Sequence, residues 1–212
     1  MIAAQAAYEA GVLAFWAAGP ADGAHDLGHL RRVWANARAI AQEEPGADMQ
    51  VLLAAAMLHD LVNLPKSSPD RAAASRLSAK AAVPLLQAAR LNADQIAATC
   101  HAIAAHSFSA GIAPETHEAR IIQDADRLEA LGAIGIARMF YVAGATGQHL
   151  FCAEDPMALH RAPDDRRFAL DHVAVKLLRL PAQMQTATGR AMAEARADWV
   201  MSFRTRLLAE IG

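Results

Sequence analysis

The sequence predicts an all-α protein, and composition and residue spacing both support this. Hydrophobic residues make up 54% of the 212 residues and aromatic residues only 5%. Much of the hydrophobic fraction is alanine, the best helix former. Apolar residues recur at helical spacings of three and four, and no alternating strand pattern is found. We therefore expect a bundle of about eight or nine helices, forming a single domain over 1–212. Its core should cover 20–180, with a C-terminal helix at 186–210 packed on it.

In the first half of the chain, glycine, proline and polar residues separate four expected helices. The first ends before Gly19-Pro20 and the second before Pro45-Gly46, because neither pair continues a helix. Asp48 is suited to cap the third helix, and Pro84 should kink or split the fourth. These helices are expected at 2–17, at 26–44, from 48 to 61 or 62, and at 70–90.

The second half of the chain opens with a capping box, Asn92-Ala93-Asp94-Gln95, which should begin a fifth helix that ends at His106. Gly132 and Gly135 suit a close contact between the two helices that follow. Residues 144–165 lack periodicity and should form a long surface loop of the kind that often contacts substrates. The remaining helices are expected at 115–131, then up to 142, at 165–179 and at 186–210.

Composition limits the classes of partner. A net charge of −2 provides no general attraction to nucleic acid or to anionic membranes. Cys100 and Cys152 form neither a CxxC motif nor a disulfide framework, which indicates reduced thiols. No apolar run reaches the ~18 residues of a membrane span, and Glu9 falls where a signal peptide would be apolar. We expect a cytoplasmic monomer or homodimer that binds neither nucleic acid nor membranes.

The strongest functional signal is the pair His59-Asp60, which ends an apolar helical run. An aspartate is rarely buried unless it is paired or holds a metal. His29 and Asp124 lie on the apolar sides of two other expected helices. Two imidazole nitrogens and two carboxylate oxygens suit Mn²⁺, Fe²⁺, Ni²⁺, Co²⁺, Zn²⁺ or Mg²⁺, and exclude a closed thiolate site.

Helical geometry leaves one alternative open for the metal ligands and argues against another. His25 precedes His29 by four residues, so both would share one face of a continuous helix. Asp126 lies about 200° around the helix from Asp124, so we do not expect it to share the ion.

Other histidines are expected to be ordinary, that is, hydrogen-bonded or exposed side chains rather than metal ligands. His101 lies about 140° from His106, so the two should not face one site. The pair Asp171-His172 shows that an aspartate beside a histidine is weak evidence alone. The same ordinary role is expected for His117, His149, His160 and His172.

The spacing of His29, His59-Asp60 and Asp124 resembles the H…HD…D signature of the HD-domain metal-dependent phosphohydrolases. Longer blocks resemble one bacterial branch, the YedJ-like proteins, and the similarity extends over residues 20–210. The blocks lie at 24–34, 59–66, 101–109, 123–135 and 171–177.

This resemblance implies an all-α HD fold and one divalent ion held by His29, His59, Asp60 and Asp124. Related branches hydrolyse nucleotide phosphates or pyrophosphates, usually with Mn²⁺ or a similar ion, which corresponds to hydrolase classes EC 3.1 or 3.6. The family's register favours His29 as the ligand and leaves His25 for the rim of a substrate pocket.

Three further side chains are candidates for contact with phosphate. Lys66 follows His59-Asp60 in a polar loop and could reach a phosphate, although an ordinary solvated lysine fits the sequence equally well. His106 could protonate a leaving group or bind phosphate. Arg127 could orient Asp124 or contact phosphate.

We therefore expect a phosphohydrolase whose metal ion and Asp60 together activate water, with a small phosphate ester, such as a nucleotide, as substrate. The alternatives are a non-catalytic nucleotide-sensing module and a di-iron HD-fold oxygenase. Because His101 and His106 share one segment, the sequence argues against the di-iron alternative.

Overall fold

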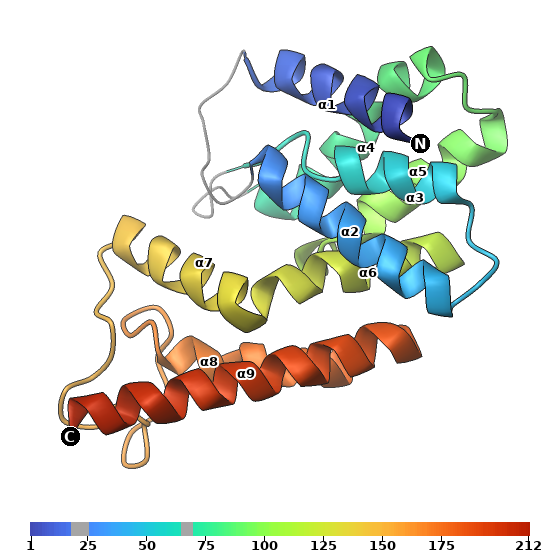
Figure 1. Cartoon of the computed structure of the whole chain (residues 1–212). Coiled ribbons are helices and arrows are strands. Elements are labelled where there is room, and N and C mark those ends of the chain that lie inside the picture. Colours follow the sequence, from blue (N-terminus) through green and yellow to red (C-terminus); the bar gives the residue numbers. More distant parts are fainter. Residues whose placement is uncertain (18–25, 65–69) are drawn as a thin grey trace. The chain divides into compact units, whose positions relative to one another are not determined.

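The computed structural model describes residues 1–17, 26–64 and 70–212 (Figure 1). These residues contain nine α-helices joined by loops and short 3-10 helices, with no strand among them, which confirms the predicted all-α class. The chain forms two compact units, 1–126 and 127–212. Whether the two units act as the single expected domain stays a prediction.

Three helices of the first unit begin at residues whose side chains cap them. Asp26 and Asp48 accept backbone N–H groups at two helix starts, and Asn92 with Gln95 forms the predicted capping box at a third. The helices are α1 (Ile2–Trp16), α2 (Leu27–Glu43), α3 (Met49–Leu58), η1 (Arg71–Ala73), α4 (Ala74–Ala88), α5 (Ala93–Ala105), η2 (Phe108–Ala110) and α6 (His117–Arg127).

The central helix of the first unit is α3 (Figure 1). Every residue from Val51 to Leu58 is buried, and α3 packs against α1, α2, α4 and α5. It ends at Leu58, three residues before the nearer of its two expected ends. The His59 side chain lies 3.0 Å from the carbonyl of Ala56, which a longer helix would use for its next N–H. The helix therefore stops where the predicted metal ligands begin.

The fourth helix is not split. α4 runs from Ala74 to Ala88 with Pro84 inside it. Proline has no N–H to donate to the carbonyl four residues earlier, at Lys80. Lys80 lies on the exposed side of α4, where water can satisfy that carbonyl. The helix therefore tolerates the missing hydrogen bond and continues through Pro84.

The second unit is built on the long helix α9, which packs against α7, η3 and η5. A sharp turn precedes α7: Gly132 has a φ of +69°. A Cβ added to Gly135 would lie 2.2 Å from the carbonyl oxygen of Ala130, so the close approach predicted here requires glycine. The helices of this unit are η3 (Leu128–Ala130), α7 (Gly132–Ala145), α8 (Asp171–Val175), η4 (Leu177–Arg179), η5 (Pro181–Gln183) and α9 (Ala187–Ile211).

The segment between α7 and α8 is a loop, as predicted for 144–165. Hydrogen bonds between charged side chains fix its conformation. Both terminal nitrogens of Arg161 donate to the carboxylate of Asp171, at 2.5 and 2.8 Å. Asp171 also accepts the backbone N–H of Asp164 at 2.6 Å. The aspartate of the Asp171-His172 pair therefore accepts hydrogen bonds from residues of this same unit.

Among the described residues, no single helix is both long enough and apolar enough to cross a bilayer. One bent pair of helices, 117–130 with 132–145, meets the criterion by length and composition only when the two are joined.

Candidate metal centre

Imidazole and carboxylate groups converge at the ends of four helices in the first unit. His29 lies in the first turn of α2, and Asp126 in the last turn of α6. His59 and His106 directly follow the last residues of α3 and α5, as their C-caps. The C-terminal end of a helix carries a partial negative charge, so α3 and α5 both favour a cation here. We call this set the His–Asp cluster: His29, His59, Asp60, His106 and Asp126.

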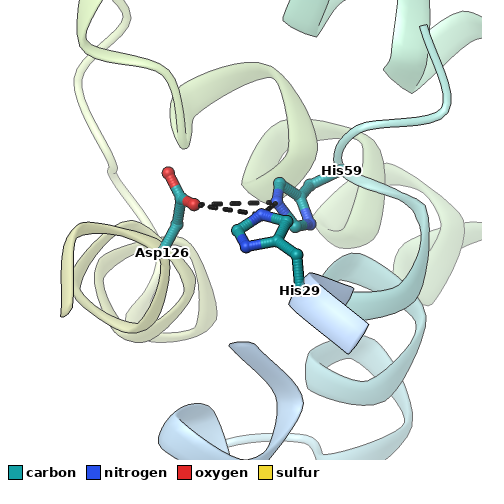
Figure 2. Close-up of side chains that lie close together, drawn as sticks. All are labelled: His29, His59 and Asp126. Carbon is teal, nitrogen blue, oxygen red and sulfur yellow. Dashed lines mark hydrogen bonds and ion pairs between the residues drawn. The ribbon is translucent and has the colours of Figure 1, made fainter. Parts of the chain in front are cut away.

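Three of these side chains form a tight triangle (Figure 2). The Nε2 atoms of His29 and His59 lie 3.2 Å apart. Oδ1 of Asp126 lies 3.5 Å from His29 Nε2 and 3.8 Å from His59 Nε2. A point equidistant from three atoms so spaced lies about 2.0 Å from each, the length of a typical metal–nitrogen bond. The three groups therefore fit a single divalent ion.

Asp60 directs its two carboxylate oxygens to different partners. Oδ2 lies 3.6 Å from Nε2 of both His29 and His59. Oδ1 lies 3.6 Å from Nε2 of His106. Asp60 is thus placed both to join the ligands of the triangle and to interact with His106.

The tautomers of two imidazoles are set by the backbone. Nδ1 of His59 lies 3.0 Å from the carbonyl of Ala56, and Nδ1 of His106 lies 2.7 Å from that of Ile103. A carbonyl only accepts, so Nδ1 carries the proton in each ring. This leaves Nε2 of both rings for the cluster, as metal-binding histidines require.

Burial and charge shift the pKa values of the cluster. Burial lowers the pKa of His59 to about 4 against the opposing charge of Asp60, so His59 is neutral near pH 7. Burial alone would raise the pKa of Asp60 and Asp126, but the neighbouring imidazoles, His59 first, hold both below their usual range. Neutral imidazole and ionised carboxylate are the forms that bind metal.

His106 differs from His59 in its pKa. Burial alone would lower the pKa of His106, but its hydrogen bond to Asp60 and the charges of Asp60 and Asp126 raise it above the usual value. The two pKa values are therefore shifted in opposite directions: the lowered pKa suits His59 to bind a cation, and the raised pKa suits His106 to carry a proton.

α6 brings Asp126, rather than Asp124, to the cluster. The two carboxylates point in nearly opposite directions around the helix, so only one can face the imidazoles. Asp124 is fully buried and belongs to neither group of potential metal ligands among the described residues. The side chain of Asp126 is 29% exposed and that of Asp60 17%. Hydrophobic periodicity favours the more buried carboxylate, but a site that admits substrate must border solvent, and this requirement favours Asp126.

The other residues considered for the site either lie outside the described residues or contact groups other than the His–Asp cluster. His25 and Lys66 lie outside the described residues. Nε2 of His101 accepts the backbone N–H of Glu115, away from the cluster. Nη1 of Arg127 donates to the carbonyl of Gln183 within the second unit, and its contact with phosphate stays a prediction.

Two of the histidines expected to be ordinary have partners of their own. His117 lies 3.1 Å from the carbonyl of Glu44, and His172 lies 2.8 Å from Asp165. Neither belongs to the His–Asp cluster.

Comparison with known proteins identifies relatives over nearly the whole chain. The family profile described as HD domain matches residues 26–131, which contain the entire His–Asp cluster. YpgQ of Bacillus subtilis strain 168 is 34% identical over 191 residues, covering 88% of this chain and 84% of YpgQ.

Solved structures share the fold. The structure of Bacillus subtilis YpgQ in complex with ADP matches with a TM-score of 0.73 and 28% identity, covering 99% of this chain and 95% of that one. An HD-superfamily hydrolase from Bacillus thuringiensis matches with a TM-score of 0.74 and 30% identity, covering 97% of this chain and 95% of that one.

Proposed function

Because the chain belongs to the HD-domain family and has the fold of HD-superfamily hydrolases, we propose that it is a metal-dependent phosphohydrolase. Its substrate is a nucleotide, cleaved at a phosphate or pyrophosphate bond by a water molecule. The observation that carries this proposal is the triangle of His29, His59 and Asp126, whose spacing fits one divalent ion. The ADP complex of YpgQ supports a nucleotide as the ligand.

The ion would be held by His29, His59, Asp60 and Asp126, with Mn²⁺ favoured over Mg²⁺, Fe²⁺, Co²⁺, Ni²⁺ and Zn²⁺. When bound, it would lower the pKa of a water molecule and neutralise charge on phosphoryl oxygens. Asp126 takes the place that the sequence suggested for Asp124, because the carboxylate of Asp126 faces the imidazoles.

The protein's own groups have separate roles in this proposal. Asp60 orients the attacking water through an oxygen near the triangle. His106, whose Nε2 faces the other oxygen of Asp60, transfers a proton to the leaving group. Lys66, His25 and Arg127 are proposed to contact the phosphates, which would orient the substrate.

The proposal is tested by incubating the protein with a panel of nucleoside mono-, di- and triphosphates in Mn²⁺, Mg²⁺, Co²⁺ or EDTA. Phosphate and pyrophosphate are measured separately, because pyrophosphate marks cleavage at the α-phosphorus. We expect metal-dependent turnover that His59→Ala abolishes and His101→Ala retains. A folded, metal-loaded protein that binds nucleotides without turnover would instead support the sensing module. Elemental analysis showing two irons per chain would support the oxygenase.

A further inference from the structure

The last turn of α5, directly before His106, is held by the side chain of His106 itself and by side chains from α4 and α6. Because the helix stops at Ala105, the carbonyls of this turn lack helical donors. The donors are His106 Nδ1 to Ile103 at 2.7 Å, Ser75 Oγ to Ala104 at 2.9 Å, and Gln123 Nε2 to Ala105 at 2.7 Å.

Of the two bonds donated by other helices, the one from Gln123 acts closer to His106. The carbonyl of Ala105 belongs to the peptide group whose nitrogen is that of His106, so holding this carbonyl holds the plane from which His106 extends. Gln123 lies on α6, three residues before Asp126. One hydrogen bond therefore joins the peptide of His106 to the helix that carries Asp126.

The side-chain oxygen of Gln123, Oε1, indicates that this side chain adds little to the stability of the fold. Gln123 is only 3% exposed, and its amide nitrogen must face the Ala105 carbonyl, because only the nitrogen donates. Within the described parts of the chain, Oε1 is buried and has no hydrogen-bond partner. An unsatisfied buried oxygen costs about as much as one such bond contributes. The amide thus constrains geometry with little net gain in stability.

We propose that Gln123 is a positioning residue. Through the carbonyl of Ala105 it holds the imidazole of His106 at its place beside Asp60. The effect on turnover rests on the proposed hydrolysis. The effect on His106 itself is a property of the protein without metal or substrate, so the two can be tested separately.

The test compares Gln123→Met with Ser75→Ala. Methionine keeps the unbranched length of glutamine and removes both the donor and the unsatisfied oxygen, so we expect a melting temperature near that of the wild type. Ser75→Ala removes the neighbouring bond to Ala104, one peptide further from His106. It serves as the control for loosening the helix end in general, and it should lower the melting temperature.

The direct readout is long-range ¹H–¹⁵N NMR of the histidine rings in the metal-free protein. We expect Gln123→Met to shift or broaden the His106 ring signals and leave those of His29 unchanged, and Ser75→Ala to leave both close to wild type. Unchanged His106 signals in Gln123→Met would overturn the proposal, whatever the activity. So would equal changes in both variants.

Kinetics provide the second readout. For Gln123→Met, kcat should fall about 10- to 100-fold, while KM and the Kd for Mn²⁺ stay within about threefold of wild type. A fall in Mn²⁺ affinity with unchanged kcat would place the effect at Asp126 and contradict the role assigned through His106. If the wild type shows no turnover with any nucleotide, the proposed function fails, and the NMR comparison still decides the position of His106.

Discussion

Replacing Asp126 should remove most of the stabilisation that a metal ion gives the folded protein. The proposed ligands come from α2, from the residues just after α3 and from α6, far apart in the sequence, so the unfolded chain does not assemble them. At a Mn²⁺ concentration 100 times its Kd, the bound ion would add about 2.7 kcal/mol to the free energy of unfolding. In a protein of this size that raises Tm by roughly 5–11 °C.

Asp126→Asn removes the negative charge and one strong oxygen donor from the triangle. Loss of an outer hydrogen-bond partner already weakens metal binding by about 10- to 100-fold, so we expect at least about 100-fold for a direct ligand. At the same Mn²⁺ concentration, the remaining stabilisation is about 0.4 kcal/mol, or about 1–2 °C.

The assay is differential scanning calorimetry with Mn²⁺ and with EDTA, and the quantity compared is the metal-induced shift in Tm within each variant. Asp124→Asn is the matched control: it can lower Tm in EDTA because Asp124 is buried, but it should keep the full metal-induced shift. If Asp124→Asn loses the shift and Asp126→Asn keeps it, the assignment of Asp126 as the fourth ligand is wrong.

Two further predictions concern the stability of the second unit. Gly135→Ala should lower the free energy of unfolding by about 2–3 kcal/mol in urea titrations, because the new methyl group would overlap the backbone at Ala130; Gly144→Ala, which meets no atom within 4 Å, should not lower it. Arg161 holds the pKa of Asp171 below its usual value against the opposing effect of burial, so this pair stabilises the fold above pH 4 or so and less as acid protonates the carboxylate. Asp171→Asn should therefore lower the urea midpoint at pH 7 and flatten its decline in acid; equal declines in both proteins would refute this role.

Local signals in the sequence predicted most of the helix starts. Asp48 and the capping box of Asn92 and Gln95 lie where the structure has them, because a cap satisfies N–H groups only two or three residues away. Helix ends were harder to predict, since they depend on what accepts or donates at the last turn. α3 stops early because the side chain of His59 reaches back to the carbonyl of Ala56, and residue spacing alone does not predict such a contact.

The sequence by itself determined the all-α class, because helical period is a local property. It also predicted three residues of the His–Asp cluster, His29, His59 and Asp60, whose role as metal ligands stays a prediction. Only the tertiary structure decided that Asp126 rather than Asp124 faces the imidazoles, and that His106 lies beside Asp60. Both depend on how far each helix is rotated about its axis when it packs. That rotation is set by contacts between residues distant in the chain, and one turn of α6 carries both carboxylates.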